Sequence, residues 1–143
     1  MKFQRTTCAC AECVACCKRQ SGPLVPGDFE RISAFLGEPV EPYLVASRGS
    51  LTLDTRTGEL RWIGSITPRM EQGRCVFLDE NDRCKIHSVS PAGCALLDTH
   101  MNIMDAQERA VWVTMQMDTE EYQRLRSTLP SNQNPGYHPK DRP

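Results

Sequence analysis

The sequence predicts a small single domain of the α+β class, stabilised by a bound metal, with short β-hairpins and a few helices. Three observations support this prediction. The chain has 143 residues, which suffices for one ordinary domain with a modest core. Its hydrophobic fraction is 39% and its mean hydropathy is -0.48, so the interior is lean. Five of its eight cysteines lie between Cys8 and Cys17, and a metal bound there could supply folding energy that a lean interior lacks.

Composition argues against several classes of protein. The formal net charge is -1 and no run of Lys or Arg stands out, so we do not expect nucleic-acid binding. No apolar segment approaches the roughly 18–20 residues that span a bilayer, so we expect no membrane association. The N-terminus lacks the apolar region of a secretory signal, which predicts a cytoplasmic protein with reduced thiols. We expect the metal-binding domain to span residues 1–129 and residues 130–143 to form a flexible tail.

The first half of the chain is expected to contain the cysteine cluster, a helix and a hairpin. Residues 8–17 should form an irregular loop or a short helical turn around the metal. Asp28 is predicted to cap a helix with apolar residues at a spacing of three to four, and Gly37 to end it. A short helix is predicted at residues 43–47. Residues 51–53 and 60–63 flank a turn sequence and predict a β-hairpin.

The second half is expected to contain another hairpin and three helices. Residues 75–78 and 83–87 flank an acidic turn and predict a hairpin with Cys75 and Cys84 on its arms. Ser90 and Pro91 make a good helix start, which places Cys94 one turn inside that helix. Residues 105–116 fit a helix, but apolar residues alternate from 111 to 117, so a strand competes there. A final helix should begin near residue 119.

The bunching of cysteines indicates metal chemistry, because a Cys-x-x-Cys turn presents two thiolates to one soft cation. A disulfide framework is disfavoured, since Cys16 and Cys17 are adjacent and the neighbouring cysteines are too close in sequence to staple a fold. Thiolates select zinc, copper(I) or iron, above all as iron–sulfur clusters. Cys10, Cys13 and Cys16 have the ferredoxin spacing, but the fourth cysteine and proline that follow in ferredoxins are missing.

Seven cysteines are candidate ligands, and we expect Cys8 to be spare. One zinc ion or one cluster needs only four thiolates. Either three thiols are structural or redox-active, or two metals share bridging thiolates. His87 could be a ligand, an outer donor or a turn residue, whereas His100 and His138 have no companion at ligand spacing and are expected to be exposed. The candidate metal ligands are Cys10, Cys13, Cys16, Cys17, Cys75, Cys84 and Cys94.

These motifs resemble the CxxCxxCC family of YkgJ-like cysteine-cluster proteins. The resemblance covers roughly residues 8–97 and rests on Cys10-x2-Cys13-x2-Cys16-Cys17, Gly73-x-Cys75-Val-Phe-Leu, Cys84-Lys-Ile-His87 and Pro91-x-x-Cys94. It implies a zinc- or iron-chelating domain with these cysteines as ligands. The chain has His87 and Ser90 where the family usually has tyrosine and arginine, so the roles of those two family residues could be altered here.

The sequence therefore favours a non-enzymatic cytoplasmic protein that binds zinc or iron, because no catalytic motif is visible. One alternative is an iron–sulfur redox protein or a protein associated with a methyltransferase, since related clusters occur in flagellin lysine N-methylases. Another is an interaction module built on a zinc-bound loop. The sequence names no protein partner and no oligomeric state.

Overall fold

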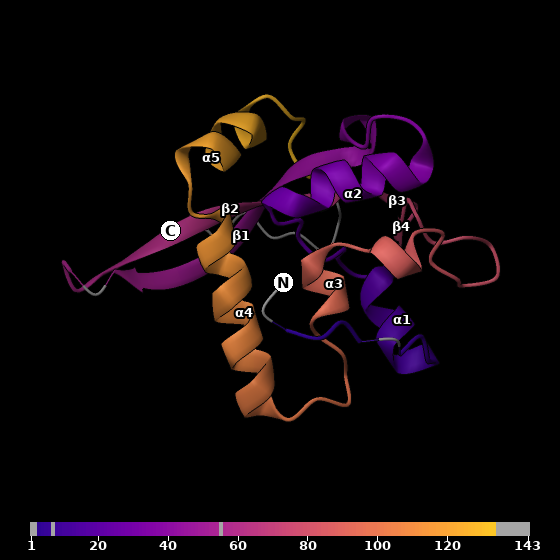
Figure 1. Cartoon of the computed structure of the whole chain (residues 1–143), viewed down its shortest axis with the longest axis horizontal. Coiled ribbons are helices and arrows are strands. Elements are labelled where there is room, and N and C mark those ends of the chain that lie inside the picture. The colour runs from indigo at the N-terminus through magenta and orange to yellow at the C-terminus, as the bar shows by residue number, and fades with distance from the viewer. Residues whose placement is uncertain (1–2, 7, 55, 134–143) are drawn as a thin grey trace.

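The computed structural model describes residues 3–6, 8–54 and 56–133 (Figure 1). Its helices are α1 (Ala11–Cys17), α2 (Pro26–Leu36), α3 (Ala92–Ala95), α4 (Ile103–Met117) and α5 (Glu120–Ser127), with 3-10 turns η1 (Glu41–Tyr43) and η2 (His87–Val89). Strands β1 (Leu44–Asp54) and β2 (Glu59–Pro68) form a long antiparallel hairpin, and β3 (Met70–Glu71) and β4 (Arg74–Cys75) a very short one. This is the small α+β fold that the sequence predicts.

The long hairpin and the cysteine-bearing elements lie at opposite ends of the molecule. In Figure 1 the tip of the β1–β2 hairpin projects to one side, while α1 and β4 lie on the other. Helix α3 sits between α1 and α4, and α2 and α5 lie near the base of the hairpin. Segments that carry cysteines far apart in sequence are thus brought to the same end of the fold.

The apolar core joins the base of the hairpin to the helices. Tyr122 of α5 is almost fully buried, donates its hydroxyl to the Leu24 carbonyl at 2.6 Å and accepts the Ile66 N–H at 2.9 Å. No helix among the described residues combines the length and apolarity needed to cross a bilayer. The most deeply buried apolar side chains include Leu24, Ile32, Val40, Leu44, Ile66, Ile86, Leu96 and Met117.

The long hairpin extends well beyond the predicted one. The hairpin expected at residues 51–53 and 60–63 is confirmed, but the strands run over residues 44–54 and 59–68. The helix predicted at residues 43–47 is wrong: η1 ends at Tyr43, and Leu44 already pairs with Pro68 of β2. The extension was hidden because its buried positions include Ser47 and Ser65, so apolar residues do not alternate there.

Asp28 plays a different part from the predicted one. Helix α2 begins three residues earlier than predicted, with Val25 as N-cap, so Asp28 is the third helical residue. Its fully buried carboxylate accepts the backbone N–H groups of Val25 and Ala92, each at 2.8 Å, and pairs with Arg31. Asp28 therefore ties the first turn of α2 to the start of α3. Gly37 ends α2 as predicted, with a φ of 74° in the left-handed region.

The segment that carries the central cysteines is less regular than predicted. Cys75 pairs with Met70 across the short β3–β4 hairpin, and the expected hairpin at residues 75–78 and 83–87 is reduced to one bridge between Leu78 and Cys84. Asp79 accepts backbone N–H groups within the connecting turn, which keeps the arms short. The predicted start of α3 is wrong by one residue, because Pro91 and not Ser90 is its N-cap. The helix has only four residues, and Cys94 is the third of them.

Helix α4 is continuous, so the strand alternative for residues 111–117 is wrong. Val113 and Met117 lie one turn apart and are buried, whereas Val111 and Met115 are 58% and 65% exposed. The alternation in sequence therefore mixes two buried and two exposed apolar residues of one helix. The predicted final helix is confirmed as α5, whose N-cap Thr119 accepts the Tyr122 N–H at 3.2 Å.

The start of the predicted tail is held against the hairpin. The Ala46 N–H donates to the Pro130 carbonyl at 2.8 Å, and the Asn132 N–H donates to the Ala46 carbonyl at 2.9 Å. The Asn132 side chain is buried and donates to the Ser47 hydroxyl at 2.9 Å. Pro130 and Asn132 are thus held against β1, at the start of the segment that was expected to form a flexible tail. Residues 134–143, with His138, lie outside the described residues.

Candidate metal centre

The eight cysteines are all described, carry free thiols and surround one region of the molecule. Seven of them line a cavity of about 320 Å³ formed by the N-terminal segment, α1 and residues 75–99. The eighth, Cys10, lies at the start of α1 and belongs to a compact group of side chains beside this cavity. The fold therefore concentrates the thiols as a metal-binding protein requires.

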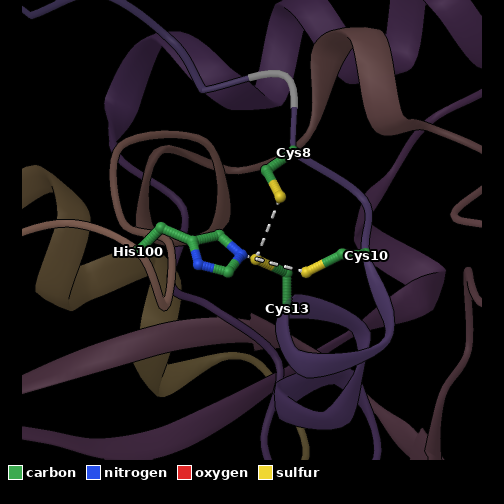
Figure 2. Close-up of side chains that lie close together, drawn as sticks. All are labelled: Cys8, Cys10, Cys13 and His100. Carbon is green, nitrogen blue, oxygen red and sulfur yellow. Dashed lines mark hydrogen bonds between the residues drawn. The ribbon is translucent and has the colours of Figure 1, made fainter.

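The compact group consists of Cys8, Cys10, Cys13 and His100, whose sulfur and nitrogen atoms all lie within 4.8 Å of one another. Figure 2 shows the four side chains converging from different directions. Cys10 Sγ lies 3.2 Å from His100 Nε2, and Cys13 Sγ lies 3.5 Å from Cys8 Sγ. Two sulfurs bound to one tetrahedral zinc at ~2.3 Å are about 3.8 Å apart. The four atoms are thus close enough together to bind a single ion.

Asp98 holds the chain segments of the compact group together. One carboxylate oxygen accepts the Thr6 hydroxyl at 2.7 Å, and the other accepts the His100 backbone N–H at 2.9 Å. The Thr6 oxygen in turn accepts the Cys8 N–H at 3.2 Å. The hydrogen bond from the Thr6 hydroxyl, followed by that from the His100 backbone N–H, lowers the pKa of Asp98. Asp98 therefore lies behind both Cys8 and His100 and fixes their segments relative to each other.

The N-terminal segment that carries Cys8 is docked on α3 and α4. The Thr6 N–H donates to the Ala95 carbonyl at 2.6 Å. Arg109 of α4 donates to the Gln4 carbonyl at 3.0 Å, and the Phe3 ring packs edge-on against Trp112 at 5.9 Å. These contacts anchor residues 3–6 ahead of the first cysteine.

The surroundings of Cys10 in the compact group favour its thiolate form, which is the form that binds metals. The Cys13 backbone N–H and the His100 side chain, in that order of effect, lower the pKa of Cys10 to about 6. Cys10 in turn raises the pKa of His100. Thiolate is the form of cysteine that binds metals. A cation entering the group would meet one thiolate already formed and would displace the remaining protons.

A second group, formed by Cys17, Cys75, Cys84 and Cys94, lines the cavity; Cys75 is buried and the other three are half-buried. Desolvation is the main cause that raises the pKa of all four thiols, to about 11 for Cys17. Negative charge on Cys75 and Cys17 would raise the pKa of Cys94 further, which means that these three sulfurs interact electrostatically. Desolvation disfavours the charged thiolate form, and a bound cation would compensate for it.

The structure divides the seven predicted ligands. Cys10 and Cys13 join the compact group, and Cys13 also lines the cavity. The other five line the cavity outside this group, and one of them, Cys16, is exposed and lies 3.8 Å from an Arg19 nitrogen. His87, at the start of η2, also lines the cavity.

Two residues outside the predicted ligand set lie in the compact group. They are Cys8, which was expected to be spare, and His100, which is exposed as expected but lies close to three cysteines. His100 is 90 residues from Cys10 in sequence, so no local spacing could reveal the pair. The only available signal was its place six residues after Cys94, the last motif cysteine.

Comparison with known proteins identifies one family. The sequence model of CxxCxxCC, described as a "putative zinc- or iron-chelating domain", matches residues 9–128. No curated protein and no solved structure matches the chain. The match includes His100 and the seven predicted ligands, and Cys8 lies one residue before it.

Proposed function

Since the chain belongs to the CxxCxxCC family of zinc- or iron-chelating domains, we propose that it binds one zinc or iron(II) ion through the compact group. The observation that carries the proposal is the convergence of Cys8, Cys10, Cys13 and His100 within 4.8 Å. Three thiolates and one imidazole form a common ligand set of zinc sites, and the same donors suit iron.

The exposure of the ligands supports a chelating role. The three cysteines are half-buried and His100 is exposed, so an ion can enter and leave without opening the core. The ligands come from two segments that Asp98 joins, the N-terminal segment with the start of α1 and the loop before α4. Binding therefore also ties these segments together, and part of its free energy stabilises the fold.

The proposed setting is the cytoplasm. All eight cysteines are free thiols, and a thiolate site of this kind persists where glutathione and thioredoxin keep cysteines reduced. The proposed activity is metal binding without catalysis, as the sequence favours. Fractionation of cells that produce the tagged protein tests the location, and recovery in an oxidising compartment would contradict it.

Metal titration of single variants tests the proposed site. Zinc affinity is measured by competition with a chromophoric chelator, and cobalt(II) replaces zinc to report thiolate and imidazole ligands by absorption. We expect the wild type to bind one ion tightly, and Cys8→Ser, Cys10→Ser, Cys13→Ser and His100→Ala each to weaken this binding. Cys16→Ser is the matched control, because Cys16 lies one turn from Cys13 in the same helix and outside the compact group.

Two outcomes would overturn the proposed site. One is wild-type affinity in both Cys8→Ser and His100→Ala. The other is a loss in Cys16→Ser as large as in Cys13→Ser, which would indicate that the ion is held by the CxxCxxCC run alone.

A further inference from the structure

We propose that Cys17, Cys75, Cys84 and Cys94 hold a second and separate metal centre, an iron–sulfur cluster, in the cavity beside the compact group. The four thiols come from the last residue of α1, from β4, from the bridge after it and from α3. They share no residue with the compact group, so this inference does not depend on the proposed function.

The spacing of the four thiols favours a cluster over a single ion. Among the described residues, the compact group is the only set of three or more ligand atoms that all lie within 4.8 Å of one another. The four cavity thiols are therefore spread more widely, yet all line one space of about 320 Å³. Sulfurs around one zinc lie about 3.8 Å apart. In an iron–sulfur cluster, irons and sulfides fill the centre and hold the four cysteine sulfurs farther apart.

Backbone N–H groups are arranged around three of these sulfurs. Burial raises the pKa of Cys75, while the Ser21 hydroxyl and the backbone N–H groups of Phe77 and Leu78 act in the opposite direction. Burial likewise raises the pKa of Cys84, and the backbone N–H of Ile86 opposes it. Hydrogen bonds to the sulfurs stabilise the negative charge of a bound cluster and set its potential.

The third of these sulfurs, that of Cys94, lies where two backbones approach each other closely. A Cβ at Gly22 would lie 2.6 Å from Cys94 Sγ and 2.5 Å from the Gly93 carbonyl carbon. A Cβ at Gly93 would lie 2.1 Å from Pro23 Cδ, and the Gly93 N–H donates to the Pro23 carbonyl at 2.9 Å. Only glycine allows this contact, which brings the loop after Cys17 against α3 and lets the Gly22 N–H reach the Cys94 sulfur.

A positively charged side chain, that of Arg5, interacts with Cys94 of the second group. Arg5 donates one guanidinium nitrogen to the Ser90 carbonyl at 2.9 Å and to the Ser90 hydroxyl at 3.2 Å. Its other terminal nitrogen, Nη1, is buried and has no hydrogen-bond partner among the described residues. Burial is the largest cause that lowers the pKa of Arg5, and Cys94 acts in the opposite direction, so the two groups interact. Arg5 is thus placed to offset the negative charge of a cluster held by four thiolates.

Anaerobic reconstitution of the full chain with iron(II) and sulfide tests the inference, with one equivalent of zinc added first to fill the compact group. We expect bound iron and acid-labile sulfide, broad visible absorption, and a cluster signature in the Mössbauer spectrum of the wild type. Cys84→Ser and Cys94→Ser should each lower bound sulfide at least fivefold. Cys16→Ser should retain it, because Cys16 lines the same cavity but lies outside the set of four.

The two sites can fail separately in this experiment. His100→Ala should lose zinc affinity and keep the cluster. A wild type that takes up no sulfide, or that binds a single zinc in the cavity, would overturn the inference. Cluster absorption that is lost in His100→Ala and kept in Cys94→Ser would also overturn it. If a serine variant fails to fold, the Mössbauer spectra of the wild type and of His100→Ala decide the question: a cluster in both supports the inference, and its absence from either overturns it.

Discussion

Replacing Asp98 by alanine should weaken zinc binding about 10- to 100-fold, although Asp98 is not a proposed ligand. The carboxylate accepts the Thr6 hydroxyl at 2.7 Å and the His100 N–H at 2.9 Å, and Thr6 accepts the Cys8 N–H. Each such hydrogen bond changes an equilibrium constant about 3- to 10-fold, so losing two gives about 10- to 100-fold. The effect arises because the segments of Cys8 and His100 lose their common anchor.

Competition with a chromophoric zinc chelator measures this change. Asp98→Asn should be intermediate, because its one amide oxygen can accept only part of what the carboxylate accepts. Asp118→Ala is the matched control, since Asp118 pairs with Arg61 at the surface away from the cysteines. An Asp98→Ala affinity within twofold of wild type, or an equal loss in Asp118→Ala, would refute the reasoning.

Three further predictions concern the fold and the cavity. Asp28→Ala should lower the free energy of unfolding by about 3–5 kcal/mol in urea denaturation, because Arg31 and two backbone N–H groups lose a buried partner. The control, Asp118→Ala, should lower it by about 0–1 kcal/mol. Equal losses in the two variants would contradict the role assigned to Asp28. Tyr122→Phe should cost about 1–3 kcal/mol by the same assay, because a buried carbonyl and a buried N–H lose the hydroxyl; an unchanged midpoint would contradict this. Gly22→Ala should lower the cluster content after reconstitution, because the new Cβ would lie 2.6 Å from Cys94 Sγ. Its zinc affinity should stay within twofold of the wild type. Full cluster content in this variant would contradict the close packing of Gly22 against Cys94.

Local signals account for the parts of the fold that the sequence predicts well. The apolar spacing before Gly37 and the N-cap at Thr119 predict α2 and α5, because helices are specified by neighbours in sequence. The first part of β1 was missed because its stability comes from pairing with β2, some twenty residues away, and from buried Ser and Thr residues. Asp28 lies three positions inside the helix that it was predicted to cap, and one of its hydrogen-bond partners, Ala92, is 64 residues away, where local sequence gives no signal.

The same distinction applies to the candidate site. Short spacings and the family motifs indicate that the cysteines bind metal, but they do not separate the thiols into sets. The division depends on α1, which places Cys13 in the compact group at the edge of the cavity and Cys17 in the cavity lining outside that group. His100 and Asp98 enter the compact group only through the loop between α3 and α4. Cys8 joins them because residues 3–6 dock on the helices.

The most direct test of the compact site is X-ray absorption at the zinc edge, on wild-type protein loaded with one equivalent of zinc. The account predicts three sulfur neighbours at ~2.3 Å and one imidazole nitrogen at about 2.0–2.1 Å, with the nitrogen lost in His100→Ala. A spectrum of four sulfurs and no imidazole, unchanged in His100→Ala, would contradict it and place the ion among the other cysteines.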